Sequence, residues 1–180
     1  TTQYTSSAAS DVYKRQLVRL SDFKSNEYRE LLGGWIFEPI EENPMIAWRG
    51  ASRYMDERFK PAFEMELDAM RSVKYDYGLD NLQLMVPFCR TPEEGSLVTG
   101  LLNEKGVGPA SGTDLFVMVE LPSNVIEADR FIEMMDLSGG SIGSNDLVQT
   151  VYAVSRDDLE GYQNPIDARS PSVKAMIRDI

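Results

Sequence analysis

Short apolar runs alternate with longer amphipathic stretches along this chain. Residues 17–20, 82–88 and 115–119 are mainly apolar and partly β-branched, which is typical of buried parallel strands. The apolar start of segment 45–54 predicts a strand end that turns into a loop, and Ser141-Ile142 predicts a fifth strand. The strands are spaced by roughly 25–40 residues, as strand–helix–strand units require. We therefore predict an α/β fold, a partial TIM-type (β/α)8 barrel with about five of its eight parallel strands.

The stretches between these runs predict helices. Phe59, Phe63, Leu67 and Met70 recur at three- and four-residue steps, and Gly78 ends this pattern. A second helix is predicted to begin after Thr91, an N-cap residue followed by proline, with Leu97, Leu101 and Leu102 on its apolar face. The other predicted helices are a turn within residues 27–32, residues 124–135, a segment from Asp146 onward and a last helix after Ser170.

Residues 1–16 are small, polar and without periodicity. The run SSAASDVYKRQ resembles translated read-through of a sequencing adaptor, and an ordinary disordered terminus has the same composition. We expect a non-native or disordered leader over residues 1–16 and a barrel domain over residues 17–180, in which residues 155–167 are predicted to be loop-like.

Composition excludes several classes of function. The net charge of −11 argues against a nucleic-acid surface, because phosphate backbones require a basic face. The sequence contains no histidine, which excludes phosphohistidine chemistry and a Ser-His-Asp triad within this chain. No apolar run approaches the ~18 residues of a membrane span. Cys89, the single cysteine, suits a reducing cytoplasm and is predicted to be a buried thiol rather than a nucleophile.

Two acidic residues follow predicted strands. Glu120 comes directly after residues 115–119, and Asp146 follows Ile142. Carboxyl ends of barrel strands form the rim where active sites are built, and two rim carboxylates suit a hard cation such as Mg²⁺. The alternative is that Glu120 caps a turn and Asp146 caps the next helix.

Three arginines also fall in or just after predicted strands, namely Arg19, Arg49 and Arg90. If the strands are parallel, these arginines meet the two acids on one face, where guanidinium groups can bind phosphate or carboxylate. The alternative is that each arginine pairs with a neighbouring acid such as Asp22. Arg53 is expected to be a solvated charge at a helix end.

Five blocks of the sequence resemble a known family. In chain order they are VRLSDFKSNEY (18–28), EENPMIAWRGASRY (41–54), LMVPFCRT (84–91), VMVELPSNV (117–125) and SIGSNDLVQ (141–149). They resemble the C-terminal phosphoenolpyruvate (PEP)/pyruvate-binding barrel of the phosphoenolpyruvate synthases (pyruvate, water dikinases), which are PEP-utilising enzymes. DFKSNEY and RGASRY favour the synthases over pyruvate phosphate dikinase and Enzyme I of the sugar phosphotransferase system, which share the barrel.

The resemblance implies roles for particular residues. Glu120 and Asp146 are expected to hold Mg²⁺, and Arg19 and Arg49 are the expected catalytic residues, in contact with the phosphoryl and carboxylate groups of the substrate. The expected substrate-binding residues are Arg19, Arg49, Glu120, Gly143, Ser144, Asn145 and Asp146.

The resemblance also implies a reaction and partners. Such an enzyme uses ATP to phosphorylate a histidine on a mobile domain and passes the phosphoryl group to pyruvate. The expected partners are pyruvate or PEP and the phosphohistidine domain of the same full-length chain, with a homodimer expected for the full-length enzyme and no nucleic acid or membrane. The acid/base cysteine, three strands and the ATP-binding and phosphohistidine domains are expected outside these 180 residues, so this piece is predicted to be inactive alone.

Two functions of other kinds remain open from the residues. One is a module that docks a phosphohistidine partner without chemistry and without Mg²⁺. The other is a lyase on a related barrel that acts on a keto acid with magnesium.

Overall fold

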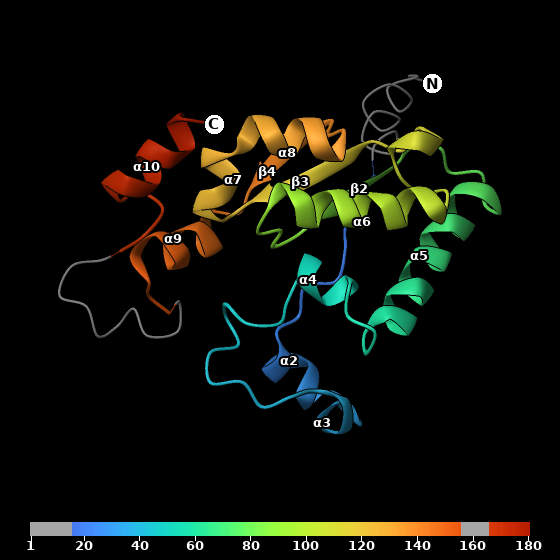
Figure 1. The fold of residues 1–180 in the computed structure, drawn as a ribbon, viewed down its shortest axis with the longest axis horizontal. Helices are drawn as coiled ribbons and strands as arrows, with labels where there is room; N and C mark the ends of the chain where they lie inside the picture. The colour runs from blue at the N-terminus through green and yellow to red at the C-terminus, as the bar shows by residue number, and fades with distance from the viewer. Residues whose placement is uncertain (1–15, 156–165) are drawn as a thin grey trace, which may run out of the picture.

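A parallel four-stranded sheet organises the chain (Figure 1). The structure is a computed structural model that describes residues 16–155 and 166–180. Its strands are β1 (Gln16–Arg19), β2 (Leu82–Val86), β3 (Leu115–Val119) and β4 (Gly139–Ile142). They pair in chain order, and each neighbouring pair is parallel. The prediction of an α/β fold with part of a TIM-type barrel is confirmed, and over the described ranges the barrel is not closed.

The strand predicted at the start of segment 45–54 is wrong. Residues 44–48 form turns and bends, so the sheet of the described chain has four strands rather than about five. The physical reason is that the backbone carbonyl groups of residues 45–49 accept hydrogen bonds from arginine side chains, where a strand would bond to its neighbour.

Helices lie between the strands and after the last strand. Their bounds are α2 (Ser25–Glu30), α3 (Gly34–Phe37), α4 (Ala51–Tyr54), α5 (Lys60–Tyr75), α6 (Pro92–Glu104), α7 (Pro122–Ile126), α8 (Ala128–Met135), α9 (Ser144–Tyr152) and α10 (Pro171–Arg178), with a short 3₁₀ helix, η1 (Pro109–Ser111). Figure 1 shows α6, α7 and α8 beside the sheet, whereas α2 and α3 are set apart from it.

Most of the predicted helices are present. Thr91 is the N-cap of α6, and its Oγ1 accepts a hydrogen bond from the backbone N–H of Glu94 at 3.1 Å. Leu97 is exposed, so its predicted place on the apolar face of α6 is wrong, and Val98 is buried beside Leu102 instead. The single helix predicted over residues 124–135 is two helices, α7 and α8, which join at Glu127.

Two predictions fall partly outside the described residues. Of the predicted leader, residues 1–15 lie outside them, and Gln16 is the first residue of β1. Of the predicted loop over residues 155–167, residues 156–165 lie outside them. Neither prediction is tested by the structure.

The sheet and its helices share one hydrophobic core. All five residues of β2 are buried, as expected for a central parallel strand. Side chains of the strands pack against apolar faces of α5, α6 and α8 in a cluster that includes Leu84, Val86, Leu115, Val117, Phe63, Leu67, Val98, Leu102, Phe131 and Met135. A smaller cluster joins α9 to α10 through Leu147, Val148, Val154 and Val173. Within the described ranges, no helix combines the length and the apolar character needed to cross a membrane.

Candidate functional site

Three carboxylates converge where the strands end. Asp22 follows β1, Glu120 follows β3, and Asp146 lies in the first turn of α9 after β4. Because parallel strands end at the same edge of a sheet, these side chains meet there. Each offers one carboxylate oxygen, and the three oxygens lie within 4.8 Å of one another.

Glu120 is the buried member of this group. Its Oε1 accepts a hydrogen bond from the backbone N–H of Phe88 at 2.7 Å, and Phe88 has φ +45°, a conformation unusual for a bulky residue. In the described part of the chain, its Oε2 is buried without a hydrogen-bond partner. Burial, reinforced by the charges of Asp146 and Asp22, raises the pKa of Glu120 to about 7.

Gly143 forms the wall against which Glu120 lies. A Cβ atom at residue 143 would lie 2.5 Å from Glu120 Oε2 and 2.7 Å from Glu120 Cβ. Only glycine therefore allows this close approach of the start of α9 to the carboxylate.

Arg49 links the other two carboxylates. Its Nε and Nη2 donate to the two oxygens of Asp22 at 3.2 and 2.7 Å, and its Nη1 lies 3.3 Å from Asp146 Oδ1. The guanidinium also lies over the ring of Phe88, 4.0 Å from its centroid. Burial raises the pKa of Asp22 although the hydrogen bonds and charge of Arg49 oppose that shift.

A small cavity of about 190 Å³ opens beside these groups. Its polar lining is Arg19, Asp22, Lys24, Glu27, Arg49, Asp146 and Gln149. The Nη1 of Arg19, an exposed residue at the end of β1, reaches across to Met118 Sδ of β3 at 3.8 Å. The cavity thus brings two arginines, a lysine and three carboxylates to one opening.

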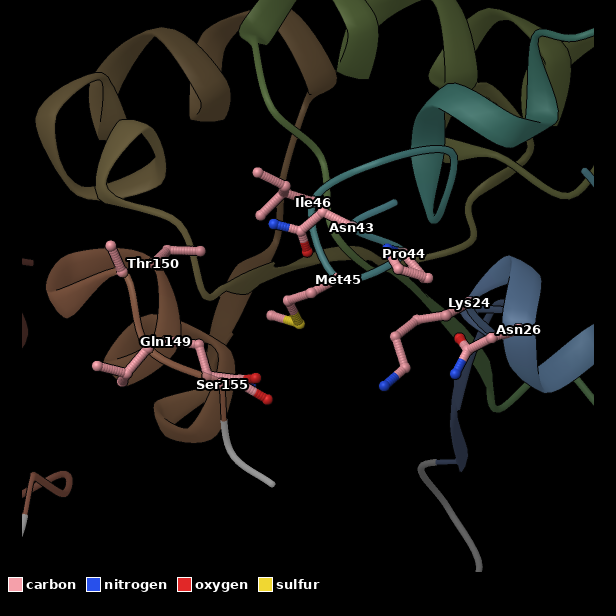
Figure 2. A pocket seen from close by; sticks show the side chains of 11 residues that line it. Lys24, Asn26, Asn43, Pro44, Met45, Ile46, Gln149, Thr150 and Ser155 are labelled. Atoms are coloured by element: carbon pink, nitrogen blue, oxygen red, sulfur yellow. The ribbon is translucent and has the colours of Figure 1, made fainter. Parts of the chain in front are cut away.

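A larger cavity of about 450 Å³ adjoins the small one, with which it shares Lys24, Met45 and Gln149. Figure 2 shows Lys24 and Asn26 on one side of it, Gln149 and Ser155 on the other, and Met45 between them.

The structure brings together most of the residues named from the sequence. Arg19, Arg49, Glu120 and Asp146 lie at one edge, and Gly143 touches Glu120. Ser144 and Asn145 begin α9 next to them, and neither is among the described residues that line the small cavity.

The expected convergence of Arg90 with these arginines is found only in part: its guanidinium group lies near that of Arg49 over the ring of Phe88 but does not reach the small cavity. That group donates to Ser52 Oγ at 2.9 Å and to the backbone carbonyls of residues 46, 47 and 49, and it is not among the described residues that line the small cavity. Cys89 is a buried thiol, as predicted, and burial raises its pKa well above the ordinary value.

The expectation that Arg53 is solvated is also wrong. Its side chain is 1% exposed and donates to both oxygens of Glu38 at 2.6 and 2.9 Å. Its guanidinium also lies 3.9 Å from the centroid of the Trp48 ring. This buried ion pair ties the segment that contains α2 and α3 to α4.

Sequence reasoning missed Asp22 as a member of the site. The signal was available, because Asp22 follows β1 just as Glu120 follows β3. From the sequence, Asp22 is predicted only as a partner for arginine, and the structure shows that it has that role and also lies beside the other carboxylates.

These residues fit a hard divalent cation. Mg²⁺ prefers carboxylate oxygens and binds through one or two carboxylates together with oxygens of water or substrate. Glu120 Oε2 has no other partner in the described chain, and Gly143 leaves room beside it. The neighbouring guanidinium groups suit an anionic ligand with phosphate or carboxylate oxygens.

Comparison with known proteins gives a consistent result. The family model described as "PEP-utilising enzyme, PEP-binding domain" matches residues 2–180. Proteins named phosphoenolpyruvate synthase are 49% identical over 165 residues in Aquifex aeolicus, 48% over 172 in a Synechocystis species and 43% over 166 in Escherichia coli. These alignments cover 91%, 95% and 91% of this chain, and 19%, 21% and 20% of the respective relatives. The resemblance predicted from five sequence blocks is thereby confirmed, and the chain spans about a fifth of the length of these relatives.

Proposed function

The chain belongs to the PEP-utilising enzymes, whose PEP-binding domain it carries, and from this we propose that it forms the pyruvate/PEP-binding part of a phosphoenolpyruvate synthase. In the proposed reaction, ATP phosphorylates a histidine, and that histidine then passes the phosphoryl group to pyruvate. Because the sequence contains no histidine, the phosphohistidine would lie outside these 180 residues. The names of the relatives favour a synthase over a dikinase or Enzyme I.

One observation carries the proposal. Carboxylate oxygens of Asp22, Glu120 and Asp146 lie within 4.8 Å of one another, beside a cavity that Arg19 and Arg49 also line. A keto acid that accepts a phosphoryl group needs both a cation for its oxygens and positive charge for the incoming phosphate.

Glu120 and Asp146 would hold the magnesium ion. Bound there, Mg²⁺ would supply a Lewis acid that stabilises negative charge on the carboxylate and carbonyl oxygens of pyruvate. Glu120 must lose its proton to act as a ligand, and its raised pKa of about 7 makes this step sensitive to pH.

Arg49 and Arg19 would bind the anionic groups of the substrate. Arg49 is held in place by Asp22, so its guanidinium is oriented before substrate arrives. Arg19 is exposed and has a weaker contact with Met118, so it is free to turn toward a phosphoryl group. Together they offset the charge that arrives with the phosphoryl group.

Isothermal titration calorimetry with Mg²⁺ and oxalate, a mimic of enolpyruvate, tests this proposal. We expect oxalate to bind only when Mg²⁺ is present, and Glu120→Gln or Asp146→Asn to weaken binding at least about tenfold. Glu133→Gln, which changes an exposed glutamate of α8, is the matched control and should bind normally.

Two results would contradict the proposal. One is oxalate binding that is equally strong without Mg²⁺, which would favour a docking module that needs no metal. The other is binding that survives unchanged in both Glu120→Gln and Asp146→Asn.

A further inference from the structure

Hydrogen bonds from arginine side chains hold the backbone of segment 45–49, which carries Arg49. Five consecutive carbonyl oxygens, those of residues 45–49, each accept a hydrogen bond from a guanidinium group. Arg49 itself bonds the carbonyl of residue 45, Arg53 that of residue 48, and Arg90 those of residues 46, 47 and 49. The ladder of a strand or helix is thus replaced by three side chains.

We propose that Arg90 is a positioning residue, which shapes the segment 45–49 so that the Arg49 guanidinium meets Asp22, Asp146 and the space for substrate. This inference rests on the proposed function of Arg49 in substrate binding. It assigns to Arg90 a role that acts through Arg49 rather than through contact with substrate.

The geometry of Arg90 supports this role. Its Nη2 donates to the carbonyls of Ile46, at 3.2 Å, and Ala47, while its Nη1 donates to Ser52 Oγ at 2.9 Å and reaches the carbonyl of Arg49 at 3.4 Å. One planar group therefore bridges the residues before Arg49, Arg49 itself and the start of α4. A planar fork with fixed donor directions can hold such a turn, whereas an ammonium group on a flexible stem cannot.

Arg90 and Arg49 also share a support. Their guanidinium groups lie 4.9 and 4.0 Å from the centroid of the Phe88 ring. The backbone N–H of Arg90 donates to Glu94 Oε2 at 2.6 Å, which fixes Arg90 to the first turn of α6. Phe88 in turn donates its N–H to Glu120, so the same short connection after β2 orients both the arginine pair and the buried carboxylate.

A close backbone contact holds the end of the segment against that connection. The N–H of Ala51 donates to the carbonyl of Pro87 at 3.2 Å. Gly50, with φ +59°, makes this approach possible, because a Cβ there would lie 2.5 Å from Phe88 Cβ and 2.7 Å from Pro87 O. The end of the segment is thus fixed by backbone, and Arg90 fixes its middle.

A kinetic double-mutant cycle in the full-length protein that contains this chain tests the proposal. The variants are Arg90→Lys, Arg49→Lys and the pair, assayed for PEP formation from pyruvate and ATP, with kcat and KM determined separately. We expect Arg90→Lys to lower kcat/KM by about 10²-fold, since small displacements of a positioned group have effects of that size. The control Arg130→Lys changes an exposed arginine of α8 that pairs with Glu93 and Glu127, and should leave kcat/KM unchanged.

Non-additivity is the decisive readout, because a merely structural residue would not produce it. If Arg90 acts through Arg49, the double variant will be no worse than Arg49→Lys, within about twofold. Losses that multiply in the double variant, or an Arg90→Lys enzyme with wild-type kinetics, would overturn the proposal.

Hydrogen exchange of the backbone amides in residues 45–53 provides a readout that needs no activity. We expect faster exchange there in Arg90→Lys than in wild type or Arg130→Lys, and unchanged exchange would overturn the role of Arg90. If Arg49→Lys alone retains full activity, the proposed function of Arg49 has failed, and the exchange result then decides by itself whether Arg90 holds the segment.

Discussion

Glu120 is the site residue whose pKa lies nearest to neutral pH. Its ordinary pKa of 4.5 is raised to about 7 by burial and by the charges of Asp146 and Asp22. The folded chain therefore binds this proton more tightly than the unfolded chain between these two values. The stability that Glu120 contributes is fully present below pH ~4.5 and is lost as the pH rises through about 7.

The first prediction follows from that sign. In urea unfolding between pH 5 and 8, the free energy of unfolding should fall with rising pH, by no more than ~3 kcal/mol from this group. Glu120→Gln should flatten the curve, because glutamine keeps the acceptor for the Phe88 N–H and has no proton to lose. Added Mg²⁺ should stabilise wild type more at pH 8 than at pH 5. Equal slopes in wild type and Glu120→Gln would refute this assignment.

The second prediction concerns Gly143. Gly143→Ala should lower the free energy of unfolding by about 1–3 kcal/mol, because its Cβ would overlap Glu120. Gly100→Ala is the control, since the Cβ would meet nothing within 4 Å in the middle of α6 and should stabilise by about 0.5–1 kcal/mol. Both changes in the free energy of unfolding would be measured by chemical denaturation. A neutral Gly143→Ala variant would show that Glu120 can move away.

At the scale of single residues, the sequence predicts which side chains lie just beyond the ends of strands. Glu120 and Asp146 are predictable because they follow apolar runs that form strands, whereas the apolar run before Arg49 forms no strand. The roles of Arg90 and Arg53 were not predictable, because their main partners include backbone carbonyls of a segment without regular structure. Such partners are set by tertiary packing.

At the scale of elements, local signals predicted helix starts well. Thr91 caps α6 as expected, and the third prediction tests its contribution. Thr91→Ala should lower the free energy of unfolding by about 1 kcal/mol, and Thr91→Ser should lower it less, because serine keeps an oxygen for the Glu94 N–H. Equal losses in the two variants would mean that the cap hydrogen bond is not the cause.

Elements with short or ambiguous patterns were predicted less well. The apolar start of segment 45–54 has the composition of a strand, but arginine side chains satisfy its carbonyls before a sheet neighbour can. Residues 124–135 have helical periodicity throughout, yet Glu127, with φ −110° and ψ 25°, ends α7 and begins α8. Hydrophobic periodicity alone does not predict such a break between two helices.

At the scale of the whole molecule, the order of the four strands was predictable because spacing and patterning fit strand–helix units. Parallel pairing brings the ends of β1, β3 and β4 to one edge of the sheet, which is why carboxylates as far apart in sequence as Asp22 and Asp146 meet there. The exposure of several large apolar side chains was not predicted from the sequence. Leu32, Trp35, Ile36, Phe37 and Ile40 of the α3 region are all more than half exposed.

The fourth prediction is that these 180 residues alone form no PEP from pyruvate and ATP. They contain no histidine to carry the phosphoryl group, and they span about a fifth of the relatives' length. Coupled assays of the isolated chain should show no ATP-dependent product. Product formed by the chain alone would refute this.

The central claim is that carboxylates distant in sequence share one cation beside Arg49. A crystal structure of the protein that contains this chain, grown with Mn²⁺ in place of Mg²⁺ and with oxalate, tests it directly through anomalous scattering. We predict a single peak at bonding distance, about 2.0–2.3 Å, from Glu120 and Asp146, with oxalate between it and Arg49. A peak elsewhere, or no peak near Glu120 at pH 8, would contradict the account.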